Sequence, residues 1–342
     1  MKASRFSLAV VAACLGLAAA ACGGGDPEGG TPAAAGQAPV LDALRLLPDE
    51  KPLRRQILFG DPAQLREIYG GTGNLGDAMT GLWLPDALAG AELPSWGRRY
   101  GFRLGSVDTF VAAGFHPRAV AVLAGRFQPD QVRAALGSSG YERRDGVLVR
   151  GKDGSVDSES KAGRLALSSL DRVAVSRERI VAASRTRLAR ATLSVGSSLA
   201  ADPSLAAAAR ALGPVTAAVI FPAELVRPAS GVLVVPVVDE PVRLLAVGID
   251  DRGGSERFFK AALVYGTADE AESEAESLAD AFGDAEVPTR AGERFSDLFE
   301  DLEAGVVGRA VLLEGRIADF ELAGVWRALL ETGDLSVLVQ AR

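Results

Sequence analysis

Side chains that can act as a nucleophile or a general base are scarce in this chain, and His116 is its single histidine. It precedes Pro117 in a turn that we expect to lead into a strand. A histidine that acts as a base needs a nucleophile to activate and a carboxylate to orient it. No Gly-x-Ser-x-Gly elbow supplies such a nucleophile. We therefore interpret His116 as a residue of a surface turn.

A serine and a lysine suggest a second kind of chemistry. Ser158 and Lys161 have the Ser-x-x-Lys spacing of penicillin-binding enzymes, in which a lysine amine lies beside a nucleophilic serine. They belong to a polar stretch, residues 152–163, and no Lys-Thr-Gly or Ser-Asp-Asn element accompanies them. We interpret this spacing as a coincidence within an exposed loop.

Three further features have the residue types of binding sites, and each is explained more simply by structure. The glycines within 70–76 and the pair Gly253-Gly254 lack the lysine and the strand–loop–helix setting of a phosphate loop, so they indicate turns. The carboxylates of an expected helix over 268–282 lack the spacing of a calcium loop and predict a solvated face. The tryptophans, which we expect in the core or at its rim, are Trp83, Trp96 and Trp326. No cofactor, metal or catalytic site is predicted.

The N-terminal segment carries the clearest signal in the sequence. Lys2 and Arg5 precede an apolar stretch over residues 6–21, which ends in three alanines. A positive start, an apolar run and small residues at its end are the parts of a secretory signal peptide. The apolar stretch is shorter than the roughly 20 residues that span a bilayer. We expect a cleaved signal over residues 1–21 rather than a transmembrane anchor or an uncleaved helix.

The alanines and the Cys22 that follows them resemble the lipobox of bacterial lipoproteins, in which the cysteine is acylated and the chain is cut before it. The resemblance covers roughly residues 1–25, and Ala19 stands where that family prefers leucine. It implies lipid attachment at Cys22 and a lipid-anchored position on the cell membrane, facing outside the cytoplasm. A rival box at Cys14 leaves a shorter apolar core, so we prefer Cys22. Residues 22–39 predict a flexible tether, because they are poor in large apolar side chains.

Composition limits the partners of the remaining chain. Without Lys2 and Arg5, the 37 basic residues become 35, against 44 acidic residues, so the net charge is −9. An acidic chain without a basic stripe argues against nucleic-acid binding. With Cys14 removed and Cys22 acylated, no thiol is left for disulfides, redox chemistry or metal ligation, so the fold has to rest on hydrophobic burial.

Strands are expected mainly as hairpins. Asp145-Gly146 joins two apolar segments and is the strongest of these turn signals. The expected strands are 56–59, 119–124, 147–149, 170–175, 180–183, 215–221, 242–249, 258–265 and 310–317. Because helices separate the hairpins, we predict an α+β fold with mostly antiparallel sheets and packed helices.

Helix starts are marked by capping residues. Asp61-Pro62 and Asp202-Pro203 place an acceptor before a proline, and Thr267 with Glu270 forms a capping box. Further helices are expected from Pro129, from a cap at Thr186, over the apolar positions 295–302 and over 325–330, whereas residues 72–95 predict a long irregular connection.

The helices between 186 and 212 suggest a boundary between two domains, residues 40–212 and 213–342. Gly125-Arg126-Phe127 and Gly315-Arg316-Ile317, each placed after a strand and before a helix, suggest that the two subdomains share a duplicated unit. The absence of a credible catalytic or metal site favours a non-catalytic binding or scaffolding role at the cell envelope. The expected partner is another protein or an apolar ligand, and the lipid anchor is expected to attach the chain to the membrane. A carrier of a lipid or other apolar ligand is an alternative, and it requires an apolar cavity of roughly a few hundred Å³. An envelope hydrolase that uses Ser158 or a pair of acidic residues is another alternative.

Overall fold

A computed structural model shows the protein folded from the start of α1 (Pro39–Leu44), whose Val40 and Leu44 are fully buried, close to where the sequence predicts the folded part to begin. Residues 36–342 form one compact unit. The expected signal peptide over residues 1–21, Cys22 and nearly all of the tether lie outside the described residues. The structure describes residues 38–70, 82, 84–88, 94–154, 171–228, 234–254, 256–318 and 324–341.

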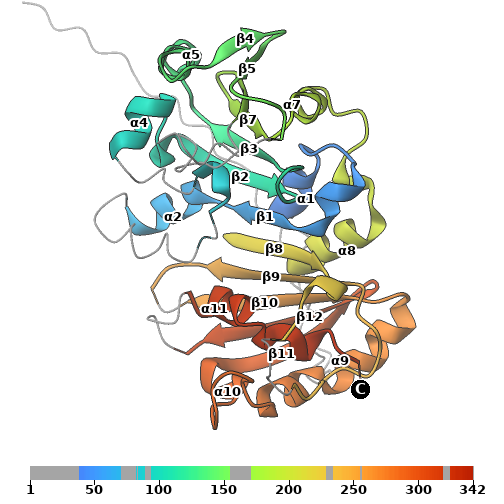
Figure 1. Ribbon diagram of the computed structural model, residues 1–342. Coiled ribbons are helices and arrows are strands. Elements are labelled where there is room, and N and C mark those ends of the chain that lie inside the picture. Colours follow the sequence, from blue (N-terminus) through green and yellow to red (C-terminus); the bar gives the residue numbers. More distant parts are fainter. Residues whose placement is uncertain are drawn as a thin grey trace, which may run out of the picture. The chain divides into compact units, whose positions relative to one another are not determined.

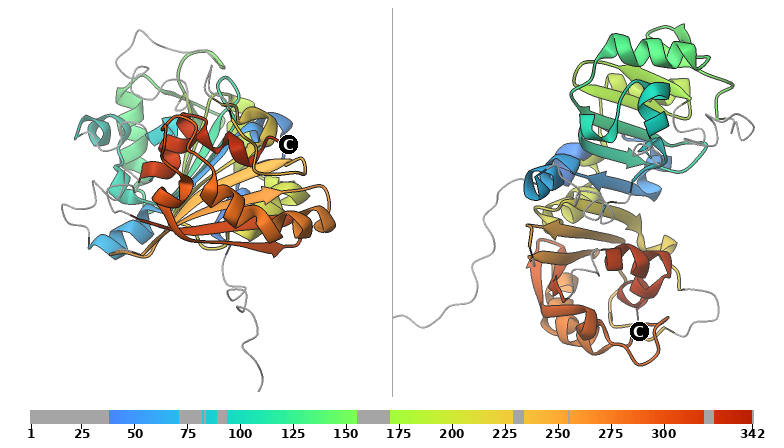
Figure 2. Two further views of the ribbon diagram at one scale, coloured as in Figure 1. Left: turned by 90° about the horizontal axis from the view of Figure 1, so that it is seen from below. Right: turned by 90° about the vertical axis from the view of Figure 1, so that its left-hand side faces the viewer.

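One antiparallel sheet of twelve strands runs through the described residues, in the order β11-β12-β10-β9-β8-β1-β2-β3-β7-β6-β5-β4 (Figure 1). The strands are β1 (Ile57–Gly60), β2 (Val107–Ala113), β3 (Val120–Gly125), β4 (Glu142–Arg144), β5 (Val147–Val149), β6 (Arg172–Val175), β7 (Arg179–Ala183), β8 (Ala217–Pro222), β9 (Leu244–Asp251), β10 (Arg257–Val264), β11 (Phe299–Val307) and β12 (Ala310–Ile317). The fold is therefore α+β with an antiparallel sheet, as predicted. Figure 2 shows the same strands from two further sides.

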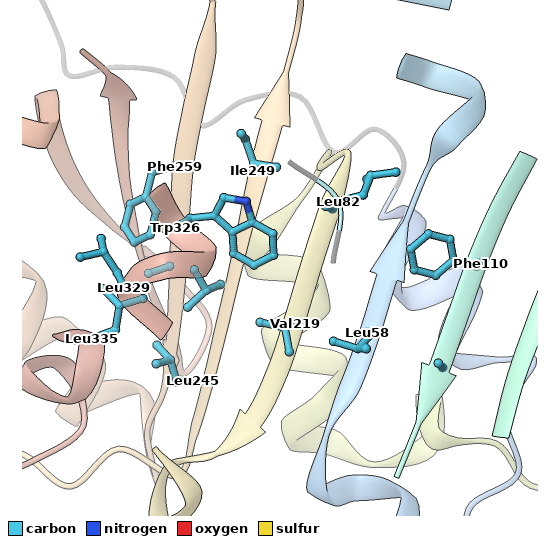
Figure 3. Close-up of a cluster of buried hydrophobic side chains, with 14 of the residues drawn as sticks. Leu58, Leu82, Phe110, Val219, Leu245, Ile249, Phe259, Trp326, Leu329 and Leu335 are labelled. Atoms are coloured by element: carbon cyan, nitrogen blue, oxygen red, sulfur yellow. The ribbon is translucent and has the colours of Figure 1, made fainter. Parts of the chain in front are cut away.

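Helices cover both faces of the sheet, because successive side chains of a strand point to opposite sides and here both sets are apolar. Face A, partly drawn in Figure 3, places Trp326 and Leu329 over the strands that carry Leu245 and Phe259. Its helices are α2 (Pro62–Tyr69), α4 (Pro94–Tyr100), α5 (Pro129–Ser138), α9 (Ala268–Asp284), α10 (Phe295–Leu298) and α11 (Val325–Glu331), and face B carries α1, α7 (Thr186–Leu193) and α8 (Pro203–Leu212). Short 3-10 helices are η1 (Lys51–Arg55), η2 (Asp86–Leu88), η3 (Leu104–Ser106), η4 (Leu199–Ala201), η5 (Ala223–Leu225) and η7 (Asp334–Leu338).

The two halves of the sheet meet where β1 pairs with β8, with Leu58 opposite Val219. The boundary expected between residues 212 and 213 falls where the chain passes from one half to the other, and both halves belong to the single compact unit. From the junction outward, the strands follow the orders β1-β2-β3-β7-β6-β5-β4 and β8-β9-β10-β12-β11. If the β6–β7 hairpin is left out, the two halves have the same strand order. In each half a helix follows the third strand: α5 follows β3, and α9 follows β10.

This topological repeat differs from the one that the glycine motifs suggest. Gly125 ends β3, whereas Gly315 lies inside β12, with two strand residues after it. The predicted equivalence of these motifs is therefore wrong, because the counterpart of β3 in strand order is β10.

Local capping signals are confirmed at three helices. The Asp61 carboxylate accepts a hydrogen bond from Gln64 N at 2.8 Å, and the Asp202 carboxylate accepts one from Ser204 N at 2.8 Å. Thr267 and Glu270 form the expected capping box of α9. Each acceptor satisfies backbone N–H groups that the first helical turn leaves without a partner.

The predicted cap at Thr186 is wrong, because Arg185 is the N-cap of α7 and has no side-chain cap bond. The carboxylate of Asp153 supplies the acceptor from a distant loop, at 3.2 Å from Thr186 N and 2.9 Å from its Oγ1. Burial raises the pKa of Asp153, but the hydrogen bonds from Thr186 and the guanidinium of Arg172 outweigh it, so the net pKa is lowered. A carboxylate from outside the helix thus replaces the local cap.

Two other segments differ from expectation. The spacing of Phe295, Leu298, Phe299 and Leu302 predicts one helix, but α10 ends at Leu298 and Phe299 begins β11. Pairing with β12 and stacking of Phe299 on Phe259, with ring centroids 4.3 Å apart, favour the strand over the local helical pattern. Within the expected irregular connection over 72–95, the described residues include η2 and the start of α4, and the rest of 71–93 apart from 82 and 84–88 lies outside the description.

Candidate functional site

An apolar cavity of about 250 Å³ opens on face A, over the strands of the first half. Its floor is formed by side chains of β1, β2, β3 and β7, and Leu84, Pro85 and Ala87 form part of its wall. Phe115 and His116 stand at its rim. We call this space the alanine cavity, because its floor residues include Ala112, Ala121 and Ala182.

The strand register explains why this face is hollow. Ala112 of β2 lies opposite Ala121 of β3, which in turn lies opposite Ala182 of β7. The flanking positions in the same row are larger, with Leu58 on one side and Val173 on the other. Cross-strand neighbours point to the same face of a sheet, so three adjacent methyl groups form a low floor for the cavity, and the alanines themselves are only 0–9% exposed.

The rim is held by a turn with several fixed contacts. Gly114 has a φ of 77°, and a Cβ there would lie 2.2 Å from the carbonyl oxygen of Arg118, so only glycine fits. The buried Ser184 hydroxyl donates to the carbonyl of Pro117 at 2.9 Å and accepts from Ala119 N at 3.1 Å. These bonds fix the turn that carries Phe115, whose side chain is 44% exposed.

His116 is exposed at this rim, as the interpretation of a surface turn predicts. Among the described residues, it has no hydrogen bond to a serine or a carboxylate. The nearby Ser184 hydroxyl is bonded to backbone groups. The arrangement offers apolar contact area and one imidazole, without the bonded base and nucleophile of a catalytic triad.

The other sequence candidates lie away from the alanine cavity. Trp96 and Trp326 are fully buried in the core of face A, and Gly253 and Gly254 have φ values of 91° and 60° in the β9–β10 turn. No described group of three or more His, Cys, Asp or Glu side chains is arranged to hold a metal ion. Candidates outside the described residues are Cys22, Trp83, Ser158, Lys161 and the glycines within 71–76.

The acidic face of α9 is mostly solvated, but Glu274 is a correction to that prediction. Its side chain is buried, and its Oε1 accepts hydrogen bonds from the backbone N–H groups of Asp239 and Glu240. A buried carboxylate needs such donors. Glu274 therefore attaches the segment before β9 to α9, a role that a count of charges along the helix could not reveal.

Buried charges at the end of β9 are a second feature that the sequence does not reveal. Asp250 and Asp251 are neighbours, so their carboxylates point to opposite faces of the sheet. On face B, Asp250 accepts from Lys260 Nζ at 3.1 Å. On face A, Asp251 accepts from Arg257 Nε at 2.9 Å and from the Tyr69 hydroxyl at 2.9 Å.

This network joins the two halves of the sheet, since Tyr69 belongs to α2 and Asp251 to β9. Burial raises the pKa of the Tyr69 phenol, which therefore stays protonated and donates to the carboxylate. The ionic side chains of the pair, Asp251 and Arg257, are both almost fully buried. We assign these groups to structure, because each charge already has a partner.

Comparisons with known proteins leave the function open. No protein-family model matches the chain, and no curated protein matches it. The chain is similar to two solved structures of TP0453: crystal form I, with 11% identity and a TM-score of 0.36 over 84% of this chain and 98% of that one, and crystal form IV, with 12% identity and a TM-score of 0.38 over 83% and 96%. We draw no functional conclusion from similarities of this size. No helix among the described residues has both the length and the apolarity that a bilayer span requires.

Proposed function

We propose that this protein is a non-catalytic binding protein of the cell envelope, which takes one hydrocarbon chain of a lipid or fatty acid into the alanine cavity. The observation that carries the proposal is the apolar hollow of about 250 Å³ whose floor includes the row of three alanines. An apolar ligand that enters such a hollow removes apolar surface from water, which is favourable.

The size of the cavity limits the ligand. Whole drug-sized ligands occupy roughly 300–1,000 Å³, so the space suits one hydrocarbon chain rather than a complete lipid. About eight methylene groups buried at roughly 0.8 kcal/mol each provide about 6.4 kcal/mol. That corresponds to a dissociation constant of roughly 20 µM if little is lost on ordering the chain. We expect reversible binding in this range.

The proposal includes an anchor. Acyl chains on Cys22 would hold the protein on the outer side of the cell membrane, because two or more chains bind a bilayer stably where one does not. Mass spectrometry of the native protein should find residue 22 acylated and residues 1–21 removed, and Cys22→Ser should release the protein from the membrane fraction. An unmodified Cys22 with the leader still attached contradicts the proposed anchor. That result would not bear on the proposal that the alanine cavity binds a hydrocarbon chain.

Binding at the cavity can be tested with a fluorescent fatty acid, cis-parinaric acid, and the variant Phe115→Glu. A charge at the rim disfavours entry of an apolar chain, so we expect binding roughly five- to tenfold weaker, about 1–1.4 kcal/mol. Leu193→Glu is the matched control, because Leu193 is 49% exposed in α7 and does not line the cavity.

The control variant should bind the probe like the wild type, and circular dichroism should show both variants folded. The glutamate at position 115 would lie near Arg55, whose guanidinium is now 5.8 Å from the Phe115 ring centroid, so the turn should tolerate the charge. Equal loss in both variants, or no saturable binding by the wild type, contradicts the proposed site.

A further inference from the structure

A second cavity, of about 390 Å³, lies at the other end of the β2–β3 hairpin from the alanine cavity. Ser106 immediately precedes β2 and lines this cavity, whereas Gly114 immediately follows β2 and lines the first. At about 3.4 Å per residue, these ends are roughly 27 Å apart. The two cavities are therefore separate sites whose occupants can be tested independently.

Three arginines from three different segments line this second cavity. Arg98 belongs to α4, Arg103 precedes η3 and Arg126 follows β3. No carboxylate is among the described residues that line it. Within the described part of the chain, none of the three side chains has a hydrogen bond or an ion pair, although the whole protein has a net charge of −7.

The backbone around the arginines is firmly held. Arg126 N donates to the carbonyl of Ser106 at 3.1 Å, which ties the segment after β3 to the start of β2. The side chain of Arg103 lies across Gly97, where a Cβ would be 2.9 Å from its Nε. The three positive side chains therefore line one cavity from fixed segments, and an anion bound there would be attracted by all three.

The N-terminus of α5 adds to the positive potential. Gln128, the N-cap of this ten-residue helix, lines the cavity, and it makes no side-chain cap bond. A helix N-terminus carries a partial positive charge and exposes backbone N–H groups. Asp130, in the first turn, is directed elsewhere, since its carboxylate is paired with Arg133 at 3.0 Å and it does not line the cavity.

We propose that this arginine cavity binds a phosphate group carried by an organic ligand. Guanidinium groups bind phosphate in a bidentate manner, and three of them match a group with several charged oxygens better than a single carboxylate does. The space exceeds a bare phosphate, and the rings of Phe102 and Phe127, whose centroids lie 6.0 Å apart, supply an apolar wall. The phosphate is either a monoester of a soluble compound or the diester of a lipid headgroup.

The test is calorimetric titration of the full-length native protein at low salt, using glycerol 3-phosphate as monoester, glycerophosphoglycerol as headgroup diester, and inorganic phosphate and acetate as reference anions. We expect saturable binding of one organic phosphate, which weakens as sodium chloride rises from about 20 to 200 mM. A preference for the monoester identifies a soluble ligand, and a preference for the diester identifies a lipid headgroup. Acetate bound as tightly as both phosphates, or no saturable phosphate binding, overturns the proposal.

A double variant, Arg103→Gln with Arg126→Gln, locates the site. The matched control is a second double variant, Arg143→Gln with Arg210→Gln. The control removes the same charge from exposed arginines in β4 and α8 that do not line the cavity. We expect the first pair to weaken phosphate binding at least tenfold and the control less than twofold. Thermal unfolding should be unchanged in both, because the substituted side chains are exposed. Equal binding by the two double variants overturns the assignment to this cavity.

Discussion

Replacing Asp251 by alanine should lower the free energy of unfolding by about 3–5 kcal/mol, because removal of one partner leaves a buried charge without compensation. Arg257, the partner, is only 2% exposed, and Tyr69 loses the acceptor of its hydroxyl group in the same step. Urea unfolding, followed by circular dichroism, measures the change.

Asp130→Ala is the matched control for this prediction, since it breaks an ion pair whose carboxylate is fully exposed. Exposed pairs contribute about 0–1 kcal/mol. The double variant Asp251→Leu with Arg257→Met should be more stable than Asp251→Ala, because neither charge is then buried alone. A loss at Asp251 no larger than that at Asp130 would show that the network does not join the two halves of the sheet as we describe.

Much of the local structure could be predicted from the sequence, because its signals are short. Asp145 and Gly146 have φ values of 49° and 82°, the conformation that a two-residue Asp-Gly hairpin turn requires. Asp61 and Asp202 cap their helices through residues two or three positions away. In each case the deciding contacts lie within a few residues along the chain.

The elements and sites that could not be predicted depend on contacts between distant segments. Residues 107–113 are not among the strands expected from the sequence, yet as β2 they pair with β1 and β3. Glu274 lies among the carboxylates of α9 that the sequence predicts to be solvated. In the structure it is buried against the segment before β9. Asp153 caps a helix that begins 33 residues later.

The alanine cavity illustrates the same limit at the site itself. Ala112 and Ala182 are 70 positions apart in the sequence and neither belongs to a recognisable motif. They become neighbours of Ala121 only because β7 returns to pair with β3 in one particular register. A shift of one residue would turn the alanines to face B. The hollow is thus a property of the register, which the sequence does not specify without the fold.

Two alanine-to-leucine substitutions, one on each face of the sheet, should therefore differ in their effects on stability and on probe binding. Ala121→Leu places an isopropyl group in the floor of the alanine cavity, whose whole volume is about 250 Å³. The free energy of unfolding should stay the same or rise, since the added carbons gain apolar contacts without displacing neighbours. The same variant should weaken binding of cis-parinaric acid by roughly 100-fold, about 2.7 kcal/mol, because leucine occupies the space of the ligand.

Ala183→Leu is the matched control, because Ala183 is the β7 neighbour of Ala182, is fully buried and points to the packed face B. There, the larger side chain should cost about 1–3 kcal/mol of stability through overpacking, while probe binding by the folded variant stays at the wild-type level. Urea unfolding and fluorescence titration of both variants separate filling of a cavity from disruption of a core. If Ala121→Leu loses as much stability as Ala183→Leu, or still binds the probe, face A is not hollow at the alanine row and the hydrocarbon chain has no site there.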